Sequence, residues 1–480
     1  MSAGCQLDER PQFRGPAAAE SEAYRAAVDF LCQRINFEQL PREQYSTAEF
    51  KLDRMQALLE RLGNPHLQFP AIHIAGTKGK GSTAAVCASL LEAIGYRVGL
   101  YTSPHLTRFE ERMRINGAEP SPAEVVGLVD DVSAAAHALS EEGPDWRPTF
   151  FEIITAMAWK HFQRARAEIV VLEVGLGGRL DATNICSPVA TVITSISRDH
   201  TRLLGDTLPE IAREKAGIIK PQIPVLSGVR DEAAAGVIEQ IAAQHDAPLF
   251  RLGREILISD ARHALDGDPL PHWTARITTP WREHPPRRTP LPGEHQIANT
   301  ALALAIVDLV AQTSSNVTDA SIDAGLNAVR WPLRIEVLRN SPLVIADAAH
   351  NVASLAALVA TLRDVPAQRR TAVFSASRDK DIAEMLRITG EFFDRIILTQ
   401  FTDNPRAVPV AELAAIAREA TDVDCTTFES SRDAWHAALA ASEPSDLICI
   451  TGSFFLAAEL RDVIRAEGQS TATPSAPLLL

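Results

Sequence analysis

The chain has 480 residues, which is enough for two or three domains of ordinary size, and two is the expected number. Apolar residues make up 46% of the chain and charged residues 22%, which is typical of a globular enzyme and excludes a disordered, collagenous or coiled-coil chain. Lys and Arg number 47 against 61 Asp and Glu, and this formal net charge of −14 argues against broad nucleic-acid binding without excluding an anionic small ligand.

Cysteine spacing and the absence of a long apolar segment predict a cytoplasmic protein. The six cysteines form no C-x-x-C pair, so we expect reduced core thiols and neither a zinc site nor a disulfide framework. Residues 1–20 are polar, lack the apolar core of a signal peptide and are expected to form a flexible extension. The longest apolar stretch, 297–311, is too short to span a bilayer. We expect no nucleic-acid or membrane partner. Small-molecule partners and a monomer are further expectations.

Strand and helix candidates alternate through the first two thirds of the chain. The predicted strands are 71–75, 98–101, 168–174, 189–196 and 224–228. The predicted helices are 82–94, 151–164, 208–218, 231–244, 297–311 and 319–329. This alternation predicts a mainly parallel sheet with helices on both faces. The rhythm breaks at 256–292, where a loop or a small antiparallel excursion is expected.

Trp331-Pro332 ends the run of helices, because proline disfavours helix in the residue before it. A second series of strands and helices follows. We therefore predict an α/β protein with two domains: residues 21–332 form a P-loop mononucleotide-binding domain with a parallel-rich sheet, and residues 333–466 form a smaller Rossmann-like domain. Residues 467–480 are expected to be a flexible tail.

The strongest motif is Gly76-Thr-Lys-Gly-Lys-Gly-Ser82, which lies between a strand candidate and a helix candidate. Backbone N–H groups of such a turn, with the N-terminus of the helix, bind anions such as phosphate. Lys80 is placed to reach the β- and γ-phosphates of a nucleotide, and the Ser82 hydroxyl to bind phosphate or Mg²⁺. The strict P-loop pattern is not met, because Gly81 separates Lys80 from Ser82. The alternative is a glycine-rich turn with an incidental lysine.

Acidic and histidine side chains follow other strand candidates. Glu173 ends a strand before a Gly-rich turn and is a candidate Mg²⁺ ligand, because ligands bind at the carboxyl ends of strands in such sheets. The alternative is a turn with a salt-bridged glutamate. Asp199 or His200 could bind a metal or cap the next helix. Lys215 is late in a helix, where a lysine is usually solvated.

In the second series, Asp347 and His350 lie just past a strand, where the alternative is a helix N-cap by Asp347 or Asn351. A phosphate-binding loop, Glu173 and a second α/β domain together suggest an ATP-using enzyme with a cleft between its domains.

These motifs, with Thr102-Ser-Pro-His-Leu106, Asp181-Ala-Thr-Asn184 and His295-Gln, resemble the folylpolyglutamate synthase and dihydrofolate synthase family of the Mur-ligase-like superfamily. The resemblance runs from about Phe50 to Leu460. It departs from the family at Leu333, where W-P-G-R is common, at Ala348, where D-G-A-H-N is usual, and at Glu49-Phe-Lys-Leu52, which weakens the case for dihydropteroate.

The resemblance implies a set of site residues, with ATP between the domains. ATP contacts are implied for Thr77, Lys78, Gly79, Lys80, Gly81, Ser82, Asn299, Arg334 and Asp347. Mg²⁺ ligands are implied at Ser103, Glu173 and His200, so Ser82 is assigned to phosphate. Lys215 matches a lysine that is carbamylated in similar enzymes, where it helps a second metal site, and a monovalent cation is a further expectation. A pterin or folate pocket is implied at Thr149, Phe151, Glu152, Asp181 and Ala182.

The implied catalytic residues are Lys80, Glu173, His200, Lys215 and His350. The implied reaction is ATP-dependent joining of L-glutamate to a folate, to dihydropteroate or to both. ATP phosphorylates a carboxylate, and the glutamate amine then displaces phosphate. Charge neutralisation by Lys80 and Mg²⁺ supports the phosphoryl transfer. The alternatives are a Mur-type ligase of another substrate and a P-loop module without ligase activity, which predicts ATP hydrolysis independent of glutamate.

Overall fold

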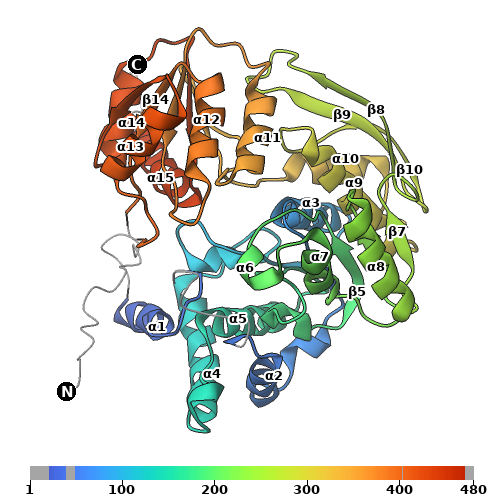
Figure 1. The fold of residues 1–480 in the computed structure, drawn as a ribbon. Coiled ribbons are helices and arrows are strands. Elements are labelled where there is room, and N and C mark those ends of the chain that lie inside the picture. The colour runs from blue at the N-terminus through green and yellow to red at the C-terminus, as the bar shows by residue number, and fades with distance from the viewer. Residues whose placement is uncertain (1–20, 39–48, 403, 471–480) are drawn as a thin grey trace, which may run out of the picture. The chain divides into compact units, whose positions relative to one another are not determined.

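The computed structural model describes residues 21–38, 49–402 and 404–470 (Figure 1). The extension expected at 1–20 and most of the expected tail, 471–480, lie outside the described residues. The chain divides into two compact units. The N-terminal unit runs to Asp266 and resumes at Pro271–Trp331, and the C-terminal unit comprises Gly267–Leu270 and the chain from Pro332 onward.

A seven-stranded sheet forms the centre of the N-terminal unit, in the order β3-β2-β4-β1-β5-β6-β7. All neighbouring strands are parallel except β2 and β3. The strands are β1 (Ala71–Ala75), β2 (Val98–Tyr101), β3 (Met113–Ile115), β4 (Ile169–Glu173), β5 (Pro188–Ile193), β6 (Val225–Ser227) and β7 (Leu249–Arg251). The parallel-rich P-loop sheet predicted from sequence is therefore confirmed.

Helices cover both faces of this sheet, as the alternation predicted. Helices α3 (Lys80–Ala93), α9 (His295–Val310) and α10 (Asp319–Ala328) share a core with one face. On the other face lie α2 (Leu52–Arg61), α4 (Pro122–Ser140) and α5 (Phe150–Ala165) (Figure 1). The remaining helices are α1 (Glu22–Cys32), α6 (Thr201–Leu204), α7 (Leu208–Ala216) and α8 (Glu232–Gln244).

Sequence reasoning left out four of these helices, α1, α2, α4 and α6. Helix α4 carried a readable signal: Ser121 caps its N-terminus, Glu124 closes a capping box and Pro122 occupies the first turn. Helix α6 is a single short turn without a side-chain cap, so its sequence has no comparable mark.

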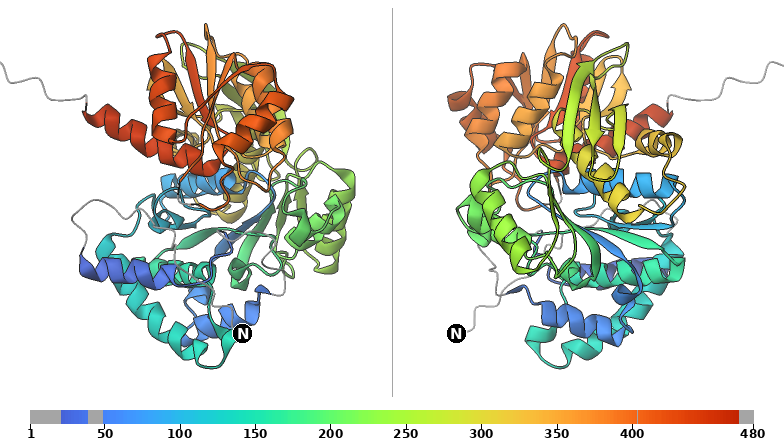
Figure 2. Two further views of the ribbon diagram at one scale, coloured as in Figure 1. Left: turned by 60° about the vertical axis from the view of Figure 1, so that its left-hand side comes forward. Right: turned by 90° about the vertical axis from the view of Figure 1, so that its right-hand side faces the viewer.

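The expected excursion after residue 256 is a three-stranded antiparallel sheet. Its strands are β8 (Leu257–Ala264), β9 (His272–Thr278) and β10 (Glu283–Arg288), yellow-green in Figure 2. A buried polar cluster fixes β10 to α9. The Asp308 carboxylate accepts from Thr279 Oγ1 at 2.7 Å and from His284 Nε2 at 2.8 Å. Arg282 Nε lies 3.5 Å from the other carboxylate oxygen.

We expect Asp308→Ala to lower the free energy of unfolding by roughly 3 kcal/mol, because it leaves buried partners without their acceptor. The matched control is Asp319→Ala on α10, since Asp319 is exposed and its pair with Arg287 should contribute less than about 1 kcal/mol. Urea unfolding followed by circular dichroism measures both variants. Equal losses in the two variants would contradict the role of burial.

A six-stranded sheet forms the C-terminal unit, in the order β11-β12-β16-β13-β14-β15. Only β11 is antiparallel to its neighbour. The strands are β11 (Glu336–Asn340), β12 (Leu343–Ala346), β13 (Arg370–Phe374), β14 (Arg395–Leu398), β15 (Asp424–Thr427) and β16 (Leu447–Thr451). The helices are α11 (Val352–Leu362), α12 (Ile382–Phe392), α13 (Val410–Ala420), α14 (Ser431–Ala440) and α15 (Phe454–Ser470). The predicted Rossmann-like α/β architecture is confirmed, and α15 extends into the segment expected to be a tail.

The structure also bears on the expectations about the cysteines and about membrane spans. The described cysteines are all free: Cys87, Cys186 and Cys449 are buried, whereas Cys32 is exposed and is therefore not a core thiol. Within the described ranges, the helices are too short or too polar for any of them to cross a bilayer.

Candidate active site

The predicted phosphate-binding turn joins β1 to α3. Gly79 is the N-cap of α3 and has a φ of 85°, a conformation that side chains rarely adopt. A Cβ at this position would also collide with the Asn299 side chain of α9. Glycine is therefore required at 79 for two reasons. The turn places Lys80 and Ser82 in the first turn of α3, where the helix N-terminus favours anions.

The residues after β5 hold this turn in place. The Thr77 N–H donates to Ser195 O at 2.7 Å, and the Lys78 N–H donates to Ser195 Oγ at 3.0 Å. Thr77 Oγ1 donates to Ser197 O at 3.2 Å and accepts from the Ser197 N–H at 3.1 Å. Thr194 Oγ1 and Ser195 Oγ both donate to Lys78 O. The amides of Thr77 and Lys78 are thus committed within the protein, and the phosphate-binding amides are expected in 79–82.

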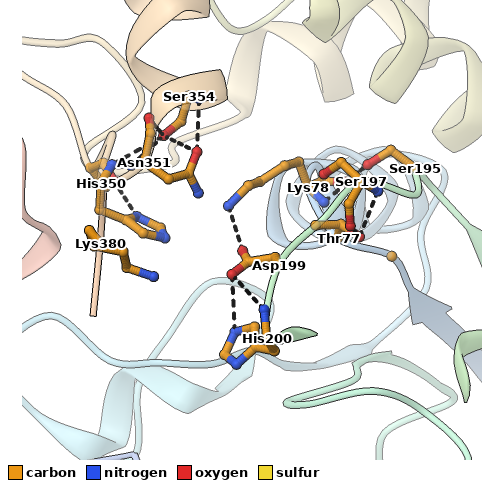
Figure 3. Close-up of polar contacts among 12 residues, drawn as sticks. Thr77, Lys78, Ser195, Ser197, Asp199, His200, His350, Asn351, Ser354 and Lys380 are labelled. Atoms are coloured by element: carbon orange, nitrogen blue, oxygen red, sulfur yellow. Dashed lines mark hydrogen bonds and ion pairs between the residues drawn. The ribbon is translucent and has the colours of Figure 1, made fainter. Parts of the chain in front are cut away.

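Figure 3 shows Asp199 between Lys78 and His200. One carboxylate oxygen of Asp199 accepts from Lys78 Nζ at 3.0 Å, and the other accepts from the His200 N–H at 3.0 Å. His200 occupies the N-cap position of α6, but its side chain makes no capping hydrogen bond. The alternative of a helix-capping side chain at 200 is therefore wrong.

Glu173 lies beside the phosphate-binding turn. It ends β4, which pairs with β1, and its side chain is buried. Its carboxylate accepts from the Ser103 N–H at 3.2 Å, and a Cβ at Gly81 would lie 3.3 Å from Glu173 Oε2. Because β4 lies between β2 and β1, the loop after β2, the carboxylate and the N-terminus of α3 come together.

This arrangement suits Mg²⁺. A buried carboxylate and a serine beside a phosphate site are the oxygen donors that Mg²⁺ takes, with phosphates and water completing the octahedron. Among the residues that the structure describes, no group of three or more His, Cys, Asp or Glu side chains is placed to hold a metal ion.

Lys215 of α7 is buried, so the expectation of a solvated lysine is wrong. Its Nζ donates to Gly76 O at 2.9 Å, which ties α7 to the phosphate-binding turn. Burial, with the charges of Lys80 and Lys78, lowers the pKa of Lys215 to about 7, although Asp199 opposes the shift. An amine with this pKa is largely neutral at slightly alkaline pH and is then nucleophilic.

Two of the residues expected in the folate pocket form a helix cap. Thr149 is the N-cap of α5, and its N–H and Oγ1 both donate to Glu152. Arg54 of α2 donates through Nε to both oxygens of Glu152, at 2.9 and 2.8 Å. All three side chains are buried. The structure therefore gives Thr149 and Glu152 a clear role in positioning the start of α5.

The other residues expected in that pocket lie around Gly175. The Phe151 ring occupies the space where a Cβ at Gly175 would be, and Asp181 Oδ2 lies 3.2 Å from the same point. Asp181 accepts from the N–H groups of Leu176 and Thr183, and burial raises the pKa of its carboxyl despite these bonds. Ala182 follows directly and is buried. The structure thus brings Phe151, Asp181 and Ala182 to one place.

The expected site residues of the C-terminal unit lie at the end of β12. Asp347 accepts from the N–H groups of Ile335 and Ala349, at 2.9 and 2.8 Å, and burial raises the pKa of its carboxyl while Arg334 opposes the rise. Asp347 thereby holds the strand-to-helix loop to the chain at 335. Leu333 occupies the position at which the family commonly has glycine. It has a φ of 55° and is fully buried.

His350 and Asn351 lie in the same loop, as Figure 3 shows. Asn351 caps α11 by accepting from the Ser354 N–H, so the capping alternative holds for Asn351 but not for Asp347. His350 Nδ1 lies 2.8 Å from Ala348 O, which requires a proton on Nδ1. In its neutral form, His350 therefore presents Nε2 as an acceptor.

Two domain families match the chain. The Mur ligase middle domain matches residues 74–307, and the Mur ligase glutamate ligase domain matches residues 333–454. The folylpolyglutamate synthase of Lacticaseibacillus casei is 36% identical over 420 residues, covering 86% of this chain and 94% of the relative. The chain belongs to the folylpolyglutamate synthase and dihydrofolate synthase family. It is an ATP-binding, ATP-dependent ligase that joins glutamate to a folate compound.

Two further comparisons agree with this membership. The dihydrofolate synthase/folylpolyglutamate synthase of Bacillus subtilis (strain 168) is 34% identical over 443 residues, covering 92% of this chain and 98% of the relative. A Mycobacterium tuberculosis folylpolyglutamate synthase complexed with ADP has a TM-score of 0.83 at 32% identity, covering 92% of this chain and 98% of that structure. The alternatives of another Mur-type substrate and of a module without ligase activity are therefore set aside.

Sequence reasoning missed several residues that shape the site of this ligase. Thr194, Ser195 and Ser197 hold the phosphate-binding turn, yet a serine or threonine after a strand is too common to be a signal. Arg54 was not predicted as a site residue, because its partner Glu152 is distant in sequence.

Proposed function

We propose that this ligase extends a tetrahydrofolate with L-glutamate through an acyl phosphate. The observation that carries the proposal is the meeting of Lys80, Ser82 and Glu173 at the N-terminus of α3. The γ-phosphoryl group of ATP passes to the substrate carboxylate and leaves ADP. The glutamate amine then attacks the acyl carbon, loses a proton, and phosphate departs from the tetrahedral intermediate.

The chain's own residues supply charge and position. Lys80 and the first-turn amides of α3 bind the phosphates, and the Asn299 side chain of α9 lies beside Gly79. Phe151, Asp181 and Ala182 form the wall of the folate pocket, and Thr149 with Glu152 sets the start of the helix that carries Phe151. ATP contacts at Arg334 and Asp347, and a role for His350 in catalysis, remain predictions from the family resemblance.

Mg²⁺ is the proposed metal, held by Glu173, Ser103 and His200. Bound there, it would neutralise charge on the transferring phosphoryl group. The proposal is supported by the buried carboxylate beside the Ser103 amide. The position of His200 in this set rests on the resemblance, as does a monovalent cation.

Carbamylation of Lys215 is the second chemical expectation for this site. A neutral lysine amine attacks CO₂, forms the N–C bond and releases a proton to give a carbamate. The pKa of about 7 makes that amine available near neutral pH. Because this pKa lies below the ordinary 10.5, the unmodified lysine destabilises the fold at acidic pH, and stability should recover as pH rises from about 7 toward 10.5.

We expect ¹³C NMR of the folded enzyme in ¹³C-bicarbonate to show a carbamate signal that grows as the pH is raised through 7. Lys215→Arg should remove the signal, because the guanidinium stays protonated. The control is Lys220→Arg, which changes the nearby half-buried lysine and should leave the signal in place. A signal that persists in Lys215→Arg would contradict the assignment.

Dihydropteroate is a second candidate acceptor, favoured by the bifunctional name of the Bacillus subtilis relative. The decisive experiment measures ADP release at saturating glutamate, separately with tetrahydrofolate and with dihydropteroate, and without glutamate as the control. Glutamate-dependent release with tetrahydrofolate supports the main proposal, and release with dihydropteroate adds the second activity. Release with neither would overturn both.

A further inference from the structure

The loop that carries His200 is fastened to the phosphate-binding turn at two points (Figure 3). The first is the reciprocal pair of hydrogen bonds between Thr77 Oγ1 and the backbone of Ser197. The second is the ion pair between Lys78 Nζ and Asp199 Oδ2 at 3.0 Å, in which the side chains are 34% and 13% exposed. We refer to these contacts together as the 77–199 clamp.

His200 itself adopts an uncommon backbone conformation. Its φ is 52° and its ψ is 34°, in the left-handed region that a non-glycine residue enters at a cost. The Asp199 carboxylate accepts from the His200 N–H, while Asp199 Oδ1 lies 3.8 Å from His200 Nε2, beyond a hydrogen bond. Asp199 therefore acts on the backbone of His200 and on Lys78 at once.

We infer that Asp199 is a positioning residue, which sets the His200 imidazole in register with the phosphate-binding turn through Lys78. The inference rests on the proposed function, in which His200 and the turn serve one nucleotide. In this arrangement, Lys78 acts through Asp199, whereas Lys80 is the lysine proposed to bind the phosphates. The clamp is expected to strengthen nucleotide binding when Mg²⁺ is bound at the same time, because only then must the turn and His200 be in register.

A double-mutant cycle tests the coupling of the pair. Lys78→Met and Asp199→Asn are made singly and together, since asparagine can still accept from the His200 N–H while losing the charge. The readout is the dissociation constant of the non-hydrolysable analogue AMPPCP, measured calorimetrically with Mg²⁺ and with EDTA. The control is Lys51→Met, which changes a half-exposed lysine of the same unit.

We expect each single variant to weaken Mg²⁺-dependent AMPPCP binding about three- to fivefold, the range of a partly exposed ion pair. The double variant should bind AMPPCP no more weakly than the single variant with the larger loss. The dissociation constants measured in EDTA should change little. Additive losses, or equal losses with and without Mg²⁺, would overturn the inference and indicate that Lys78 binds phosphate directly. A wild-type enzyme that does not bind AMPPCP would instead overturn the proposed function.

The Thr77 contact supplies an independent test. Thr77→Ser keeps the hydroxyl and should retain wild-type affinity for AMPPCP. Thr77→Val removes both hydrogen bonds and should weaken AMPPCP binding in Mg²⁺ about tenfold. Equal affinity in the two variants would contradict the clamp. Thermal unfolding of each variant identifies any loss that arises from misfolding.

Discussion

Lys80→Ala is expected to lower the rate constant of glutamate-dependent ADP release by about 100- to 1,000-fold, the range for removing one group that stabilises transition-state charge. Lys80 is in the first turn of α3 and half-exposed, so the substitution removes a charge from the phosphate site without opening the core. The measurement is a coupled assay of ADP with tetrahydrofolate at saturating glutamate.

Lys51→Ala is the matched control, because Lys51 is half-exposed and its ion-pair partner, Asp145, is exposed. It should retain the wild-type rate. Circular dichroism should show both variants folded. A folded Lys80→Ala enzyme with near wild-type activity would remove Lys80 from the phosphate site.

Glu173→Gln is expected to lower the same rate constant by on the order of 100-fold or more, through loss of the proposed Mg²⁺ ligand. Glutamine is nearly isosteric and its oxygen can still accept from the Ser103 N–H, so the variant removes charge while the local geometry persists. The Mg²⁺ concentration that gives half-maximal rate should rise at the same time. A titration of ADP release against Mg²⁺ measures both quantities.

The control for this variant is Glu232→Gln in the exposed first turn of α8. It makes the same chemical change far from β4 in the sequence and should leave the titration unchanged. Full activity in a folded Glu173→Gln enzyme would exclude Glu173 as the metal ligand, while a higher Mg²⁺ requirement alone would support it.

The structure decides the role of three basic side chains that follow Ser103 in the sequence. Arg108, Arg112 and Arg114 follow Ser103 closely in the sequence, where basic side chains either bind an anionic ligand or form an ordinary solvated face. Each pairs with a glutamate, and Arg112 is fully buried, where it donates to Glu38 Oε1 at 3.0 Å and to His105 Nδ1 at 2.7 Å. Their charges are therefore used within the fold, so local groups such as Lys80 must offset the net charge of −14.

Features that depend on neighbours along the chain could be predicted from the amino-acid sequence. An apolar run followed by glycines and a helical pattern gave β1, the turn and α3 with Lys80 and Ser82 in the first turn. The same reasoning located Glu173 at the end of β4, because strand length and the glycines that follow are local properties.

Which of these features lie next to one another depends on how the chain packs. The order β2-β4-β1-β5 places Glu173 between the Ser103 loop and the phosphate-binding turn, and sets the residues after β5 against Thr77. It also buries Lys215 and so lowers the pKa of that lysine. Strand order and burial follow from packing between segments far apart in sequence, which no local pattern encodes.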